Sequence, residues 1–254
     1  MVKHKIQPSG LCLNCGSAHV QNYCPVCGQK AQPTKLPIRL FLADTIESLF
    51  NIDNRWFITL RHLFTKPGKV TEEYINGKRA KYLPPLRIYL SMSIMYFLLV
   101  QVTKSSQVFF INLSNGDEGI ESLGTIVQYS LFLLVPVFAL ILMLLYRKRK
   151  AFYLEYLILA LHIHTIWFVL FMVELLTVWL TNTFNTAWVG WLAKGINIPN
   201  QLAFFIYLGL YQKRTFNESW VKVIFKSFGV MLLYMMALTS VLALYYFVIL
   251  DFIP

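Results

Sequence analysis

The carboxy-terminal two thirds of the chain consists of long apolar runs joined by short polar connections. Predominantly apolar sequence covers residues 86–103, 124–146, 152–180 and 223–252. A helix needs roughly 20 such residues to cross the hydrocarbon core of a bilayer. A further apolar run, residues 201–211, is short of a crossing unless its flanking residues contribute. We therefore predict about five transmembrane helices, with a re-entrant hairpin as the alternative for the fourth.

The segment that precedes these runs has a different pattern. Between residues 36 and 64, apolar side chains recur at helical spacing among charged ones, which predicts two short amphipathic helices with a break at residues 51–54. Neither helix is long enough to cross a bilayer. We expect both to lie in the headgroup region, with Trp56 and Arg61 as interfacial anchors.

A turn and a basic run lead from this segment into the first apolar run. Thr71 is predicted to cap a short helical turn, and Gly77 is predicted to end it. The cations that follow are Lys78, Arg79, Lys81 and Arg87. A basic run beside a membrane segment is typical of a cytoplasmic flank. The same four side chains are candidates for contact with lipid phosphates or with a partner protein.

The composition is that of a membrane protein. Hydrophobic residues make up 57% of the 254 and charged residues only 14%, which is too apolar for an ordinary soluble domain. Lys and Arg number 23 against 12 Asp and Glu, and the excess is concentrated in the first third and at residues 147–150. This distribution favours a cytoplasmic amino terminus whose cations face anionic lipid headgroups. Binding of nucleic acid is the less favoured interpretation of the same cations. Residues 1–10 contain no apolar run, so we expect no cleavable signal peptide.

Four cysteines stand near the start of the chain in two matched pairs. Cys12 and Cys15 form one pair, Cys24 and Cys27 the other, and each pair encloses two residues. Two such pairs can place four sulfur atoms around one ion, and the glycine after each pair suits a tight turn. Disulfides or a redox dithiol are the alternative, which a reducing cytoplasm disfavours. We predict a structural Zn²⁺ with four protein ligands, and a rubredoxin-like iron is the alternative metal.

The third apolar run contains ionisable side chains at membrane depth, namely His162, His164 and Glu174. Such groups are expensive in hydrocarbon and often serve a proton or ion path. His162 and His164 project to nearly opposite sides of a helix, so they cannot form a ligand pair of the i, i+4 kind. Hydrogen bonding between packed helices is the alternative role, which we prefer. No catalytic arrangement can be assembled from neighbouring motifs, so no catalytic residue is predicted.

Several short motifs together resemble an uncharacterised bacterial family. They are Cys12-x-x-Cys15-Gly16, Tyr23-Cys24-Pro-x-Cys27-Gly-Gln29, Asn51-x-Asp53, Phe57-x-Thr59-Leu60, Pro67-Gly68, Tyr74-Ile-x-Gly77-Lys78-Arg79 and Tyr82-x-x-Pro85. Members of that family are similar in having a short zinc-ribbon head, a juxtamembrane motif and several membrane spans. The resemblance covers residues 12–95 by motif and the later spans only by hydropathy. The resemblance implies a bacterial inner-membrane protein, and it implies no particular substrate.

The chain is thus predicted to be an all-α polytopic membrane protein with a small amino-terminal zinc-ribbon module. We expect the zinc ribbon at residues 1–32, an amphipathic collar at 33–85 and the transmembrane domain at 86–254. The leading hypothesis is a non-enzymatic protein whose cytoplasmic zinc ribbon docks on a partner protein or on the membrane surface. A transporter of a small solute or ion is one alternative, and a membrane enzyme acting on lipid is another. The expected partners are membrane lipids and a cytoplasmic protein.

Overall fold

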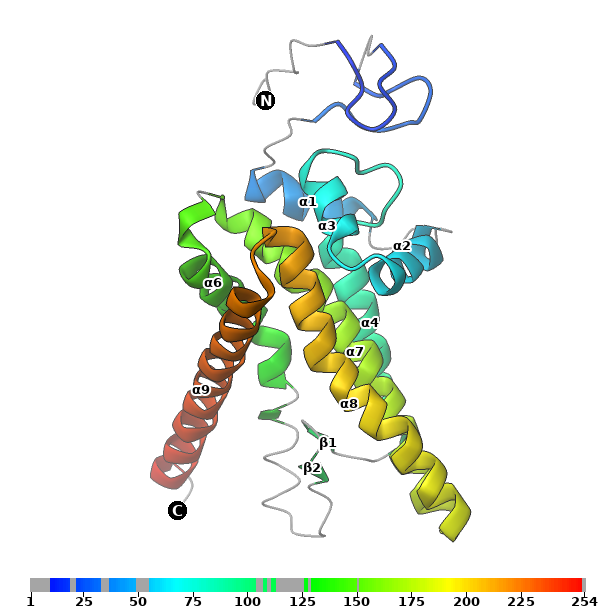
Figure 1. Ribbon diagram of the computed structural model, residues 1–254, viewed down its shortest axis with the longest axis vertical. Coiled ribbons are helices and arrows are strands. Elements are labelled where there is room, and N and C mark those ends of the chain that lie inside the picture. Colours follow the sequence, from blue (N-terminus) through cyan, green and yellow to red (C-terminus); the bar gives the residue numbers. More distant parts are fainter. Residues whose placement is uncertain are drawn as a thin grey trace.

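The computed structural model describes residues 10–18, 22–32, 37–48, 55–103, 107–108, 111–112, 126–127, 129–149 and 151–252. The cysteine-rich segment lies at one end, a group of short helices follows it, and long helices extend away from both (Figure 1). The short helices are α1 (Ile38–Ser48), α2 (Arg55–Thr65) and α3 (Lys69–Ile75). The long helices are α4 (Pro85–Thr103), α7 (Tyr153–Phe184), α8 (Ala187–Phe216) and α9 (Trp220–Phe252). The remaining elements are the antiparallel pair β1 (Gln107–Val108) and β2 (Ile111–Asn112), helix α6 (Val135–Leu145) and the 3-10 helix η1 (Arg147–Arg149).

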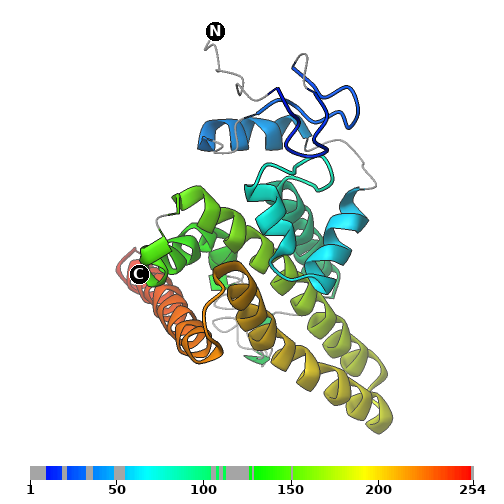
Figure 2. The same ribbon diagram turned by 45° about the horizontal axis from the view of Figure 1, so that its top comes forward.

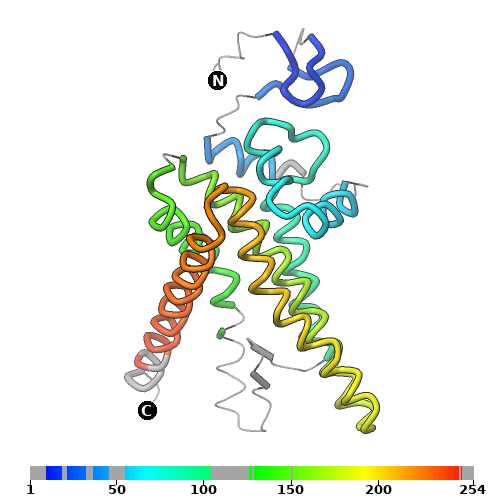
Figure 3. Tube along the Cα trace, in the orientation of Figure 1, coloured from blue at the N-terminus to red at the C-terminus, as the bar shows by residue number. Residues whose placement is uncertain are grey.

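Helix α7 is the centre of the bundle. It packs against α4, α6 and α8, and 72% of its most apolar 18-residue stretch is buried. Trp167 stacks on Phe204 of α8 with ring centroids 4.3 Å apart, and Phe168 lies 5.3 Å from Tyr96 of α4. A helix that is apolar all round is expected where neighbours cover it on every side. Figure 3 shows α7 and α8 running side by side along their length.

Three helices among the described residues are long and apolar enough to cross a membrane, namely α4, α7 and α9 up to residue 245. They correspond to the first, third and fifth predicted spans. The second predicted span is described only in part. Its apolar helix α6 has 11 residues and begins after a turn at Leu134, with Pro136 in its first turn. Of residues 104–123, which join the first two predicted spans, the structure describes only 107–108 and 111–112.

The fourth apolar run is part of a much longer helix than its hydropathy predicts. Helix α8 has 30 residues and continues through Pro199 without a reversal, so the described segment is not a re-entrant hairpin. At about 1.5 Å per residue it is roughly 45 Å long. The run looked short because polar residues precede it. Asn197 accepts a hydrogen bond from α7 at 2.7 Å, and Asn200 and Gln201 donate hydrogen bonds to α7 at 2.9 and 3.0 Å.

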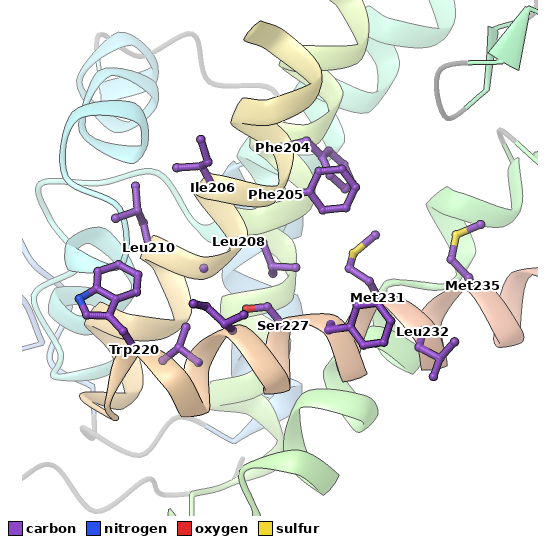
Figure 4. Close-up of a pocket in the computed structure, with 14 residues that line it drawn as sticks. Phe204, Phe205, Ile206, Leu208, Leu210, Trp220, Ser227, Met231, Leu232 and Met235 are labelled. Atoms are coloured by element: carbon purple, nitrogen blue, oxygen red, sulfur yellow. The ribbon is translucent and has the colours of Figure 1, made fainter. Parts of the chain in front are cut away.

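Helix α9 stands apart from the other long helices. Only 17% of its most apolar stretch is buried, and Figure 2 shows it diverging from α8. An apolar groove of about 760 Å³ lies between these two helices, with Trp220 and Met231 of α9 facing Phe204 and Leu210 of α8 (Figure 4). This groove is open along one side. A membrane would therefore supply most of the contacts of α9.

The two amphipathic helices predicted before the first span are present as α1 and α2, while the predicted break at residues 51–54 lies outside the described residues. Helix α2 buries Thr59 and Leu63 against its neighbours. Trp56 is partly buried against the core, whereas Arg61 is exposed beside Phe57, which is 72% exposed. The helix thus has one apolar face toward the protein and further apolar side chains on its outer surface.

Candidate metal centre and the contacts that support it

Each cysteine pair forms a tight turn that the backbone closes. The amide of Gly16 donates to the carbonyl of Cys12 at 2.8 Å, and the amide of Gly28 donates to the carbonyl of Cys24 at 2.9 Å. Both glycines have a positive φ, 76° for Gly16 and 69° for Gly28, where a side chain would be strained. The two cysteine motifs therefore fold into two similar turns.

The four cysteine sulfur atoms lie within 4.8 Å of one another. Sγ of Cys12 is 3.6 Å from that of Cys27, and Sγ of Cys15 is 3.5 Å from that of Cys24. A disulfide needs about 2.05 Å, whereas four thiolates around a tetrahedral zinc ion are roughly 3.8 Å apart. The hydroxyl of Ser17 lies 3.0 Å from Sγ of Cys24, and this contact, together with backbone N–H groups of Cys27 and Val26, lowers the pKa of that thiol to about 5, which favours the thiolate form. The site can thus hold one metal ion with four sulfur ligands.

A glutamine side chain joins the cysteine module, the described part of residues 1–32, to the collar at residues 33–85. Gln29 is buried, its amide nitrogen donates to the carbonyl of Gly77 at 2.8 Å, and its amide oxygen accepts from the backbone N–H groups of Arg79 and Ala80 at 2.8 and 2.9 Å. Gly77 has a φ of 91°, and a Cβ there would approach Leu13 of the module to 2.6 Å. The loop after α3 is therefore shaped to receive the module.

Charged side chains extend this junction toward α1. Lys30 forms an ion pair with Asp44 at 3.5 Å, and Gln32 donates to the other oxygen of the same carboxylate at 2.5 Å. The guanidinium of Arg79 donates to Gln32 at 3.4 Å and lies 5.5 Å from the ring centroid of Tyr74. Together with Gln29, these groups line a cavity of about 400 Å³ between the module and the collar.

The structure divides the four cations that the sequence singles out before the first span. Lys78 and Lys81 are exposed, Arg79 is half-buried at the junction just described, and Arg87 is buried in α4. Contact with lipid phosphates or a partner stays a prediction, and Lys78 and Lys81 have the exposure that it requires.

The collar is joined to the long helices by a buried polar contact that includes Thr71. This residue lies inside α3, and the helix begins after Gly68 without a side-chain cap, so the predicted capping role of Thr71 is wrong. Its hydroxyl lies 2.6 Å from Nδ1 of His162 in α7 and also contacts the hydroxyl of Tyr211 in α8. All three side chains are fully buried. Helix propensity could not reveal this role because the partners are 91 and 140 residues away.

The other two ionisable residues that the sequence singles out in α7, His164 and Glu174, have separate partners. Nδ1 of His164 lies 2.8 Å from the carbonyl of Ala160, and its Nε2 lies 3.0 Å from the hydroxyl of Tyr234 in α9. Glu174 accepts a hydrogen bond from Gln201 of α8 at 3.0 Å. The structure therefore does not bring His162, His164 and Glu174 together in one site. Each instead links α7 to a different neighbour.

Comparison with known proteins adds one match. The family described as "Protein of unknown function (DUF3667)" matches residues 53–97. The described part of this region comprises α2, α3, the loop that receives Gln29 and most of α4. No curated protein and no solved structure matches the chain. The chain is thus similar to an uncharacterised family over the part that connects the cysteine module to the membrane helices.

Replacement of Gln29 by Ala should loosen the junction without removing the metal ligands. The N–H groups of Arg79 and Ala80 would lose their acceptor, so their amide hydrogen exchange should accelerate by roughly tenfold or more. Hydrogen-exchange mass spectrometry of the segment around residue 79 measures this, and Asn22→Ala, an exposed amide of the same module, is the control. Unchanged exchange in Gln29→Ala would show that the amide does not hold the module.

Replacement of Thr71 by Val should destabilise the whole protein. The change keeps the shape of the side chain but leaves His162 and Tyr211 without their shared partner, at about 1–3 kcal/mol. For a chain of this length, the midpoint of thermal unfolding in detergent should fall by roughly 3–10 °C. Thr71→Ser keeps the hydroxyl and should retain most of the stability. Equal midpoints for the Val and Ser variants would contradict this account.

Proposed function

We propose that this chain is a non-enzymatic protein of the bacterial inner membrane. Its cysteine module binds one structural Zn²⁺ in the cytoplasm and docks on a partner protein. Four sulfur ligands complete a tetrahedral zinc site and leave no position for water or substrate. The ion would supply folding energy to a module with almost no apolar core, and no step of a reaction is assigned to it.

Exposed apolar side chains on the cysteine turns carry this proposal. Leu11 is 57% exposed, Tyr23 59% and Val26 72%. A partner that covers these three side chains would remove their apolar surface from water, which favours docking at this module. Gln29 holds the module in one position on the collar, so a partner would meet a rigid surface and would not have to order it.

The outer face of α2 supports attachment to the membrane surface beside this docking site. Phe57, Ile58 and Phe64 are all exposed, and the cations Arg61 and Lys66 lie next to them. An amphipathic helix with aromatic and basic side chains of this kind binds the headgroup region of a bilayer. The collar would then keep the cysteine module close to the membrane, where its partner would also have to be found.

Two variants of the full-length protein test the docking role. Cys12→Ser with Cys15→Ser should lose the bound metal and any co-purifying protein, while the membrane helices keep their thermal midpoint in detergent. Leu11→Ser with Val26→Ser should keep one metal ion per chain and still lose the same protein. Elemental analysis and mass spectrometry measure both. If the second variant retains the partner, or if the wild-type protein carries no transition metal, the proposal fails.

Labelling of the cysteines tests the orientation. A membrane-impermeant thiol reagent, applied with a chelator, should modify Cys15 and Cys27 only after spheroplasts are permeabilised. These are the two cysteines with the greater exposure, and the described residues contain no others besides Cys12 and Cys24. Labelling of intact spheroplasts to the same extent would place the module outside and would overturn the cytoplasmic assignment.

A further inference from the structure

A basic pocket lies where α6, η1, the end of α8 and the start of α9 meet. It has a volume of about 420 Å³, and its lining includes five cations, Arg147, Lys148, Arg149, Lys222 and Lys226, and one carboxylate, Glu218. These elements lie at the ends of the membrane helices nearest the collar (Figure 1). The pocket is therefore at the level expected for lipid headgroups on the side of the cysteine module.

Two aromatic rings line this pocket and contact two of its cations. Tyr146 and Phe216 stack with ring centroids 3.6 Å apart, and the hydroxyl of Tyr146 donates to Gln212 at 2.7 Å. Arg149 lies over the ring of Phe216 at 5.3 Å, and Lys226 over the ring of Tyr146 at 4.0 Å. The positions of two of the cations are thus set by the protein before any ligand binds.

Glu218 and three of the five cations have hydrogen-bonding or charge capacity that the protein does not use. Lys226 pairs with Oε1 of Glu218 at 2.7 Å, but Oε2 of the same carboxylate is buried and has no hydrogen-bond partner among the described residues. Arg147, Lys148 and Lys222 are exposed, and none of them forms an ion pair within the described part of the chain. The pocket therefore offers several unneutralised cations and one acceptor that lacks a donor.

We infer that this pocket binds an anionic glycerophospholipid whose headgroup carries a hydroxyl group. Its phosphate lies against Arg147, Lys148 and Lys222, and a headgroup hydroxyl donates to Glu218. Its acyl chains lie along exposed apolar residues below the pocket, such as Leu144 of α6 and Phe225 of α9. Basic pockets between membrane helices at the cytoplasmic surface are a recurring arrangement for such headgroups. The positive-inside bias alone requires cations at this level but no cavity that gathers them around a carboxylate.

The test adds lipids to the full-length protein in a neutral detergent and follows thermal unfolding. Dioleoyl phosphatidylglycerol should stabilise the protein at concentrations roughly 10- to 100-fold below those that dioleoyl phosphatidylcholine needs. The triple variant R147Q/K148Q/K222Q should lose this preference. The triple variant R39Q/K194Q/R214Q removes three exposed cations that lie outside the pocket and outside α2, and it should keep the preference.

Three results would overturn the assignment. The pocket variant could keep the preference for phosphatidylglycerol, or both triple variants could lose it equally, which would indicate general surface charge. Glycerol 3-phosphate could stabilise the protein as well as the lipid does, which would indicate a soluble phosphate ligand. Should R147Q/K148Q/K222Q fail to fold, the single change Lys222→Gln is used instead. It should weaken the preference several-fold, and no change in this variant would also refute the site.

Discussion

Inside a bilayer, the polar side chains of long helices can find hydrogen-bond partners only within the protein, because hydrocarbon offers none. This constraint accounts for the way the bundle is assembled. His164 pairs with Tyr234 of α9, Glu174 with Gln201 of α8, and His162 with Thr71 of the collar. Each contact joins α7 to a different element. His162, His164 and Glu174 therefore stabilise the packing of α7 against its neighbours.

A continuous series of contacts also joins the cysteine module to the long helices. Gln29 of the module bonds to the backbone at residues 77–80, and α3, which precedes that loop, is held by Thr71 to both α7 and α8. The family match at residues 53–97 covers the middle of this series and neither of its ends. The part that is similar to that family thus includes the loop that contacts the module and the helix α3 that contacts α7 and α8.

Much of this architecture follows from the sequence, but the contacts between its parts do not. Apolar run length predicts α4, α7 and α9, and cysteine spacing predicts the cluster of four sulfur atoms, because both depend on residues close together in the chain. The length of α8 was missed because Asn197 and its polar neighbours read as an interruption when their partner helix is unknown. Thr71 was misjudged for the same reason, since its partners lie 91 and 140 residues away.

Gly77 illustrates how narrowly the two halves of the molecule are fitted together. The residue has a left-handed backbone, offers its carbonyl to Gln29 and leaves room for Leu13 of the module. One extra carbon atom here would act as a wedge, because Leu13 would have to swing aside and the turn would resist its new side chain. A larger residue at this one position would weaken the attachment of the cysteine module to the collar and would leave the metal ligands and the long helices unchanged.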